Sequence, residues 1–362
     1  MRQDSLRRPA PHPPCNTSRN KSTRSVEAEE NIQNKSHNTA ISGPLCLLEK
    51  KISSFDALYI PVAASPTTPP ASPPRIVGIM SDLRAPEHQV AGHRAAPDKL
   101  GPLVDGAGLF YKPLQALDRG EQELAFYTAF SAHPDVPPRI RDAFFPRFHG
   151  TRLLPTAASP GESHPHLILD DILKGLAAPS VTDIKIGACT WPPRAPEPYV
   201  EKCLAKDRGS TSVLLGFRVS GVMVSDPSGV VWRPDRSELK GTDIPGVRRM
   251  LRRYVSSVGG EDCALAAAVY GGEGGVLAQL RELKAWFEVQ TLFHFYSASV
   301  LLSYDANAVT APGGAPRVKL VDFAHVVESE GVIDHNFLGG LCSLIKFIDD
   351  IVSSDKAPPV QS

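Results

Sequence analysis

The N-terminal part of this 362-residue chain is the feature that most restricts where the chain can fold. Residues 1–84 hold 11 of the 34 prolines, including the run SPTTPPASPP at 65–74, and show almost no apolar periodicity. Such a segment cannot bury enough apolar surface to offset the loss of chain entropy. We therefore predict that residues 1–84 are a disordered Pro/Ser-rich extension and that the folded body begins near residue 85.

The formal net charge of zero conceals an uneven distribution along the chain. Residues 1–79 carry 10 basic and 6 acidic side chains, which leaves 29 basic and 33 acidic side chains in residues 80–362. An acidic excess in the folded part argues against broad nucleic-acid binding, because that binding neutralises many phosphates at once. We therefore expect any polyanion site to be local, and we expect no direct nucleic-acid binding.

Cysteine spacing and hydropathy set further limits. The six cysteines form no CxxC pair and no Cys/His pattern typical of a zinc site. We expect reduced thiols in an intracellular compartment. No stretch approaches the roughly 20 consecutive apolar residues of a membrane-spanning helix, so we expect no transmembrane segment. Met80 directly precedes the first globular-looking segment and is a second candidate for the start of translation.

The first predicted structural unit of the body is a hairpin followed by a helix. Residues 104–114 (VDGAGLFYKPL) predict two strands around an Asp-Gly turn, with Lys112 on the second strand. Residues 118–130 predict a helix, because apolar side chains recur at three-residue spacing. This helix carries Glu123, and a helix glutamate that steadies a strand lysine is typical of sites for ATP phosphates.

The apolar run at 166–173 (HLILDDIL) predicts a buried strand that passes into a connector. We therefore predict an N-terminal lobe at 85–172, a C-terminal lobe at 173–355 and a tail at 356–362. Further strands are predicted at 181–187, 292–304 and 318–321, and residues 213–224 predict strands around a turn at Ser220-Gly221. Further helices are predicted at 197–207, 246–256, 276–290 and 337–352.

Two motifs in the predicted C-terminal lobe could carry chemistry. Asp183 and Lys185 in PSVTDIKIG lie on the same face of one strand, which suits either an exposed ion pair or an acid for a sugar hydroxyl beside a base for a phosphate. In VKLVDFAH an apolar strand delivers Asp322 and His325 at its end. A carboxylate there could hold Mg²⁺ against phosphates, or it could simply cap the strand beside a satisfied histidine.

The order of these features is more informative than any one of them. A strand lysine, a helix glutamate, a connector, a sugar-binding acid and a late metal-binding aspartate follow one another as in a two-lobed ATP-dependent phosphotransferase. The glycine-rich stretch at 271–275 lacks the Lys-Ser/Thr ending of a P-loop. Signatures of ordinary protein kinases and of serine hydrolases are also missing.

These residues resemble the inositol polyphosphate kinase family, and most closely its plant multikinases. The family's PxxxDxKxG signature is met at 179–187, its SxxLL-like segment at 297–302 (SASVLL), and its DFAH motif at 322–325. The stretches PEHQVAGH (86–93), GPLVD (101–105), KPLQ (112–115) and VIDHNFLGGLCS (332–343) look like the plant members in particular.

The resemblance implies an α+β, two-lobed fold that is protein-kinase-like and SAICAR-synthase-like, with ATP bound in the cleft. It also implies roles for individual residues on the ATP side. These are Lys112 with Glu123 behind it for the ATP phosphates, the backbone at Asp170 and Ile172 for adenine, Asp183 for the ribose, Leu302 for the nucleotide pocket, Asp322 for Mg²⁺ and Lys185 for the phosphoryl group in transfer.

On the substrate side the resemblance implies a set of side chains that hold the phosphates of an inositol phosphate, namely Gln115, Arg119, Lys185, Lys202, Lys206 and His325. Lys202 and Lys206 are four residues apart, so they share one face of the predicted helix. A second basic cluster at 248–253 is expected mainly to be a solvated face, with nuclear localisation or an acidic partner as the alternative.

The sequence thus predicts a monomeric, ATP- and Mg²⁺-dependent kinase of the nucleus and cytoplasm. Its expected reaction takes inositol 1,4,5-trisphosphate and tetrakisphosphates at the 6- and 3-hydroxyls to a pentakisphosphate. Two alternatives stay open. One is a noncatalytic inositol-phosphate sensor or scaffold that contacts proteins of the transcription machinery, and the other is a phosphoinositide lipid kinase.

Overall fold

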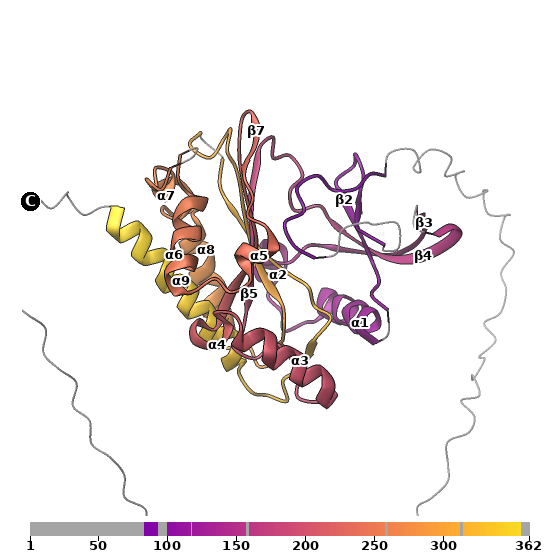
Figure 1. The fold of residues 1–362 in the computed structure, drawn as a ribbon. Coiled ribbons are helices and arrows are strands. Elements are labelled where there is room, and N and C mark those ends of the chain that lie inside the picture. Colours follow the sequence, from indigo (N-terminus) through magenta and orange to yellow (C-terminus); the bar gives the residue numbers. More distant parts are fainter. Residues whose placement is uncertain are drawn as a thin grey trace, which may run out of the picture. The chain divides into compact units, whose positions relative to one another are not determined.

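The structure is a computed structural model that describes residues 83–92, 100–116, 118–156, 159–257, 260–311 and 314–355 (Figure 1). The predicted disordered extension, apart from its last two residues, lies outside the described residues. The alternative start at Met80 and the predicted tail at 356–362 lie outside them as well. No helix among the described residues is long and apolar enough to cross a membrane.

The described residues form a mixed α and β fold, as the sequence predicts. The strands are β1 (Leu103–Val104), β2 (Leu109–Pro113), β3 (Phe148–Thr156), β4 (Ser159–Asp170), β5 (Pro179–Ile186), β6 (Phe217–Asp226), β7 (Gly229–Trp232), β8 (Phe293–Phe295), β9 (Ser299–Asp305), β10 (Arg317–Val321) and β11 (Val326–Glu328). The helices are α1 (Asp118–Ala132), α2 (Pro138–Phe144), α3 (Glu197–Arg208), α4 (Ser212–Leu215), α5 (Arg236–Leu239), α6 (Ile244–Tyr254), α7 (Ala266–Val269), α8 (Val276–Phe287) and α9 (His335–Asp355).

The first sheet has four strands in the order β1-β2-β4-β3. The predicted Asp-Gly hairpin is present, and its turn is closed by Asp105, whose Oδ1 accepts hydrogen bonds of 2.9 Å from the backbone N–H groups of Gly108 and Leu109. Asp105 Oδ2 also accepts a 2.9 Å hydrogen bond from the hydroxyl of buried Tyr111. The turn is thereby fixed to β2, so that the position of Lys112 on this strand is well defined.

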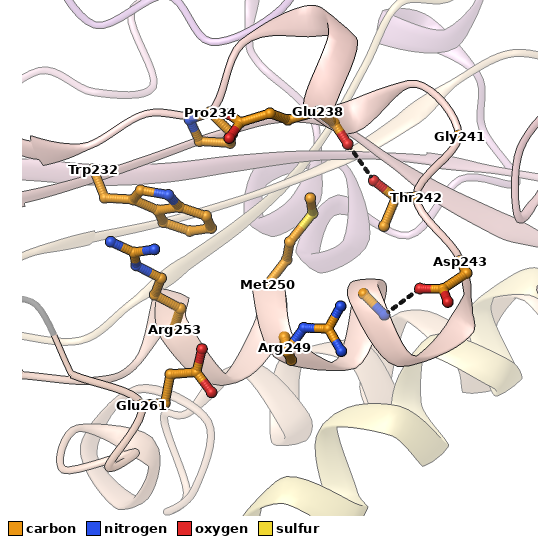
Figure 2. A pocket seen from close by; sticks show the side chains of 11 residues that line it. Trp232, Pro234, Glu238, Gly241, Thr242, Asp243, Arg249, Met250, Arg253 and Glu261 are labelled. Atoms are coloured by element: carbon orange, nitrogen blue, oxygen red, sulfur yellow. Dashed lines mark hydrogen bonds between the residues drawn. The ribbon is translucent and has the colours of Figure 1, made fainter.

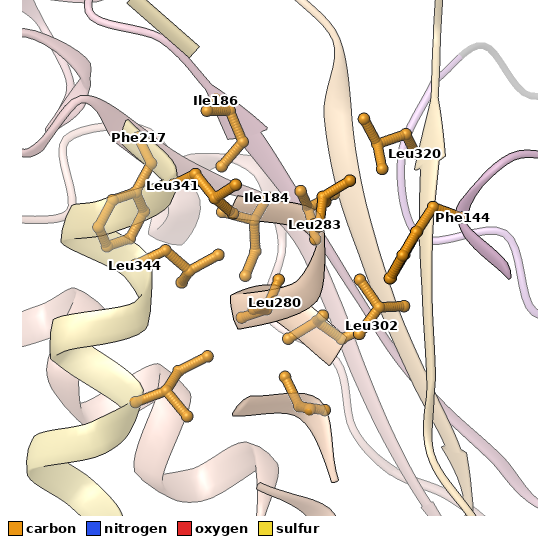
Figure 3. Packing of buried hydrophobic residues seen from close by; sticks show 14 of the residues in the cluster. Phe144, Ile184, Ile186, Phe217, Leu280, Leu283, Leu302, Leu320, Leu341 and Leu344 are labelled. Carbon is orange, nitrogen blue, oxygen red and sulfur yellow. The ribbon is translucent and has the colours of Figure 1, made fainter. Parts of the chain in front are cut away.

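The second sheet has five antiparallel strands in the order β10-β9-β5-β6-β7. Figure 3 shows that Ile184, Leu302 and Leu320 of this sheet point toward the helices. They pack with leucines of two helices, Leu280 and Leu283 of α8 and Leu341 and Leu344 of α9. Because side chains alternate between the faces of a strand, the residues between these core positions face away from the helices.

Two strand predictions are only partly correct. The predicted pair of strands at 213–224 is instead the short helix α4 followed by the single strand β6, which runs through the predicted turn at Ser220 and Gly221. Helix α4 ends at Gly216 in the left-handed conformation, with φ 71°. Gly216 adopts this conformation without steric cost, so the chain turns there before it enters β6. The predicted strand at 292–304 is divided into β8 and β9, and between them Ser297 has a φ of 60°. An apolar run in the sequence cannot reveal such a break, because the break arises from the backbone angles of one residue.

We expect the replacement Leu283→Ala to lower the free energy of unfolding by about 2–5 kcal/mol, because the lost side chain leaves a cavity in the core. Leu283 is fully buried between α8 and the second sheet. The matched control is Leu214→Ala on α4, where the side chain is 74% exposed. Urea unfolding should show a change within about 0.5 kcal/mol for the control. Equal losses in both variants would contradict this packing.

Candidate active site

Lys112 joins the two sheets through two carboxylates. Its Nζ lies 2.7 Å from Glu123 Oε1 on α1 and 2.7 Å from Asp322 Oδ1, directly after β10. Burial alone would lower the pKa of Lys112, but the carboxylates of Asp322 and Glu123 raise it above its ordinary value. The lysine therefore remains charged over the whole physiological pH range. Its contact with Asp322 joins residues that are 210 positions apart in sequence.

Glu123 also holds the DFAH segment in place. It is 1% exposed, and its Oε1 accepts a 3.1 Å hydrogen bond from the backbone N–H of Phe323. The residue before it, Asp322, has a φ of 69°, a left-handed conformation that costs a non-glycine residue free energy. This turn carries the Asp322 carboxylate toward Lys112, so the strained backbone and the ion pair occur at the same residue.

Asp183 and Lys185 extend this site along β5. Both lie on the face opposite the core, in register with Leu301 and Ser299 of β9. Burial raises the pKa of Asp183 to about 6, with Asp322 adding to the rise and Lys185 opposing it. Among the described residues, Asp183 Oδ1 is buried without a hydrogen-bond partner. A buried acceptor without a partner is a candidate ligand-binding atom, because leaving it unsatisfied costs free energy.

The amine of Lys185 donates a hydrogen bond to the carbonyl of Ser297. Burial lowers the pKa of Lys185, and the carboxylates of Asp322 and Asp183 oppose that effect. Ser297 is the left-handed residue between β8 and β9, so the strand break described above supplies the acceptor. Lys185 is thereby oriented on the same face as Asp183.

The acids present fit a divalent cation that is shared with a ligand. No group of three or more His, Cys, Asp or Glu side chains capable of holding a metal occurs in the described part of the chain. Mg²⁺ commonly takes one or two carboxylates and completes its shell with phosphate oxygens and water. Asp322, whose side chain is 44% exposed, offers such a carboxylate.

His325 meets a residue that the sequence analysis did not assign to the site. Its Nε2 lies 2.9 Å from the hydroxyl of Tyr199 on α3. Burial, together with the cations Arg119 and Lys185, lowers the pKa of His325. Burial also raises the pKa of Tyr199 to about 12. Both side chains are therefore neutral at pH 7. The spacing of Tyr199, three residues before Lys202 on the predicted helix, was the available signal.

Arg218 is a second missed residue, and it anchors the helix that carries Lys206. It pairs with Lys185 across β5 and β6, and its NH1 lies 2.7 Å from Asp207 Oδ1 at the end of α3. Thr190 donates a 2.7 Å hydrogen bond to the other oxygen of Asp207. Desolvation and the cations Arg218 and Lys185 lower the pKa of Lys206. Lys206, Lys185 and Arg218 therefore form one positively charged region.

The remaining predicted substrate residues lie around this region without joining it closely. Arg119 is half-buried in the first turn of α1, and it influences the pKa values of His325 and Tyr199. Gln115 is half-buried just after β2, while Lys202 is exposed on α3. Their roles toward an inositol phosphate stay predictions.

The structure does not bring Leu302 together with the other residues predicted to bind the nucleotide. Leu302 is fully buried in the core, where it faces the helices (Figure 3). Its neighbour Leu301 lies opposite Asp183 and packs near Ile172 instead. Neighbouring residues of a strand lie on opposite faces, so Leu301 rather than Leu302 is on the face that carries Asp183. At the connector, the Ile172 carbonyl accepts a 2.8 Å hydrogen bond from Arg317, and the Asp170 carboxylate lies 2.7 Å from His149 Nε2.

The basic cluster at 248–253 is largely occupied by other contacts. Arg248 pairs with Asp350 at 3.7 Å, Arg252 donates to the Glu261 carbonyl, and Arg253 stacks over Trp232 at 4.5 Å. Figure 2 shows the pocket of about 430 Å³ beside this cluster, lined by residues of α5, α6 and the chain around them. Two guanidinium groups and three carboxylates line it, so it has no cationic excess for a polyphosphate.

Comparison with known proteins shows consistent similarity. The profile of the family described as inositol polyphosphate kinase matches residues 166–349. The chain is 75% identical over 282 residues to an inositol polyphosphate multikinase of Oryza sativa subsp. indica, covering 75% of this chain and 96% of the relative. It is 52% identical over 285 residues to inositol polyphosphate multikinase beta of Arabidopsis thaliana, covering 75% of this chain and 94% of that protein.

Two solved structures have a similar fold. One comes from structural studies and protein engineering of an inositol phosphate multikinase, with 46% identity, a TM-score of 0.55, and coverage of 63% of this chain and 99% of that chain. The other is a multikinase of S. cerevisiae in complex with ADP and Mn²⁺, with a TM-score of 0.52 and coverage of 68% and 99%. At 20% identity the yeast structure supports the fold alone.

We expect Asp207→Ala to lower the free energy of unfolding by about 3–5 kcal/mol, because it leaves the buried Arg218 guanidinium without its counter-charge. Asp207 is fully buried, and its ion pair with Arg218 is the one that fixes α3 to β6. The control is Glu282→Ala, which removes an ion pair to Arg139, a side chain that is 81% exposed. That loss should stay below about 1 kcal/mol in the same denaturant titration. Similar values for the two variants would contradict the anchoring role of Asp207.

Proposed function

The chain belongs to the inositol polyphosphate kinase family, and from this premise we propose that it is an ATP-dependent inositol polyphosphate multikinase. The family profile and the rice and Arabidopsis relatives confirm the resemblance drawn from its motifs. The solved structures confirm the predicted kinase-like α+β fold. The observation that carries the proposal is Lys112 Nζ, held 2.7 Å from carboxylate oxygens of both Glu123 and Asp322.

On the nucleotide side, Lys112 binds ATP phosphates as a permanently charged donor, and Glu123 keeps it oriented. Asp183 accepts hydrogen bonds from the ribose hydroxyls through its otherwise unpartnered oxygen. Asp322 would supply a carboxylate oxygen for a divalent cation, and that ion would offset the negative charge of the phosphates. The related yeast structure was solved with ADP and Mn²⁺, and we propose Mg²⁺ as the ion for this chain.

For the transfer itself, we propose that the chain supplies mainly position and charge. Phosphoryl transfer proceeds with little covalent participation of the enzyme, so fixed cations near the transferred group carry much of the rate. Lys185 is such a cation, oriented by the Ser297 carbonyl on the same strand face as Asp183. Lys185 is close enough to Lys112 and to Lys206 for their charges to interact with its own, which suits a cation that serves both the donor and the acceptor.

For the acceptor, we propose inositol 1,4,5-trisphosphate and the derived tetrakisphosphates, phosphorylated at the 6- and 3-hydroxyls to a pentakisphosphate. The cations Arg119, Lys185 and Lys206 would bind the ring phosphates, with Lys202 and Gln115 at the edge. His325 and Tyr199 form a neutral hydrogen-bonding pair beside them. The names of the rice and Arabidopsis relatives as multikinases support more than one acceptor position.

We also propose that the protein acts as a monomer in the nucleus and cytoplasm, with protein partners in the nucleus. These proposals derive from the family resemblance. Most of the 248–253 cluster is engaged in contacts within the folded body. The cluster therefore gives little support to nuclear localisation or to an acidic protein partner.

The deciding experiment is an anion-exchange product profile of the full-length chain incubated with MgATP and inositol 1,4,5-trisphosphate. We expect sequential tetrakisphosphate and pentakisphosphate peaks. Asp322→Asn should abolish both peaks, because it removes a metal ligand and a partner of Lys112, while the circular dichroism spectrum stays unchanged. Folded, nucleotide-binding wild-type protein that forms no product would contradict the kinase proposal, and near-full activity of the variant would contradict the role of Asp322.

A pH profile tests the role of Asp183. The pKa of Asp183, about 6, lies above the ordinary value, so the carboxylate becomes protonated as the pH falls through 6. The protonated group can no longer accept hydrogen bonds from both ribose hydroxyls. We expect kcat/KM for MgATP to fall roughly fourfold between pH 7.5 and pH 5.5 through this group alone. Asp183→Asn should have a lower kcat/KM and should lack this component. If wild type and Asp183→Asn had identical pH profiles, the decline would come from titration of the nucleotide rather than of Asp183.

A further inference from the structure

The segment from Arg84 to Gly92, here called the strap, contacts both sheets. At its start, the backbone of Arg84 exchanges two hydrogen bonds with Val104 of β1, at 3.0 and 2.8 Å. Toward its end, Arg236 donates a 2.8 Å hydrogen bond to the Gly92 carbonyl, and Arg233 donates to the carbonyl of Gln89. The strap thus joins the edge of the first sheet to the end of the second, and it contains most of the PEHQVAGH stretch.

The strap rests on β6 at a position where only glycine fits. A Cβ atom on Gly221 would lie 2.4 Å from the Val90 carbonyl oxygen and 2.8 Å from the Val90 carbonyl carbon, distances that Cβ atoms essentially never show. Gly221 lies directly opposite Asp183 on the neighbouring strand. Because opposite residues in an antiparallel pair share a face, Val90 lies on the face that carries Asp183.

The side chain of Val90 joins a small apolar cluster on that same face. Val181, Met223 and Leu301 are its buried members, and Val90, Ile172, Leu173 and Val321 pack against them while only partly buried. The cluster therefore presents an apolar surface beside the Asp183 carboxylate. It also includes Ile172, at the connector where the family resemblance places adenine.

We infer that Val90 is a nucleotide-positioning residue, which acts by holding Ile172 and Leu301 in the wall that receives a purine nucleotide. This inference rests on the proposed function, because it takes the Asp183 face as the nucleotide side. An apolar wall next to an acid suits a flat base attached to a hydroxylated sugar. The role of the strap is therefore to complete one wall of the ATP site from outside the two sheets.

Kinetics of the full-length chain test this role. We expect Val90→Ala to raise KM for MgATP roughly threefold to tenfold, as the loss of two methyl groups from the wall predicts. KM for the inositol phosphate should stay unchanged, and Val90→Ile should restore KM for MgATP. The matched control is Val230→Ala on β7 of the same sheet, 49% exposed and outside the cluster, which should leave both constants unchanged.

Calorimetric titration with MgADP separates this inference from the proposed function. Weaker binding by Val90→Ala, with recovery in Val90→Ile, supports the inference even if the wild type phosphorylates no inositol phosphate. Equal MgADP affinity in wild type and Val90→Ala overturns it, as does a lowered melting temperature with both KM values unchanged. Wild-type protein that binds no nucleotide would overturn the inference and the proposed function together.

Discussion

The arrangement of the site depends on one partly buried cation between two carboxylates. A lysine ammonium in this position would be costly without counter-charges, and its two partners come from different parts of the fold. Glu123 belongs to the helix beside the first sheet, and Asp322 follows the last strand of the second. Neither sheet could hold Lys112 in this state alone. The site therefore exists only when both sheets are folded and in contact.

In the second sheet, side chains that pack in the core alternate along the strand with side chains that face the site. On β5, Ile184 and Ile186 enter the core, while Asp183 and Lys185 face the site. The same rule explains why the sequence analysis could place some residues and not others. It placed Asp183 and Lys185 together correctly, since both lie in one strand. For Leu302 the motif identified the strand but not which face the side chain occupies, and the structure places Leu302 on the core side.

Other parts of the site were beyond reach because their signals are not local. Tyr199 and His325 are 126 residues apart, and the helical spacing that puts Tyr199 near Lys202 does not identify His325 as its partner. Arg218 is one charged residue in an apolar strand, and only the pairing of β5 with β6 shows that it lies beside Lys185. The left-handed backbone at Asp322 and Ser297 is likewise invisible in residue types, since neither is a glycine. By contrast, the hairpin with Lys112 was predictable, because the Asp-Gly turn acts within a few residues.

The hydrogen bond from the Phe323 backbone to Glu123 has a dynamic consequence. Its acceptor is the same oxygen that binds Lys112, so one atom secures both the cation and the turn behind Asp322. Any motion that draws α1 away from the second sheet must break the hydrogen bond from Phe323 to Glu123, whereas Lys112 can stay paired with Glu123 if β2 moves with α1. Separation of α1 from the second sheet would therefore free the backbone turn behind Asp322, so the position of the Asp322 carboxylate depends on the contact between this helix and that sheet.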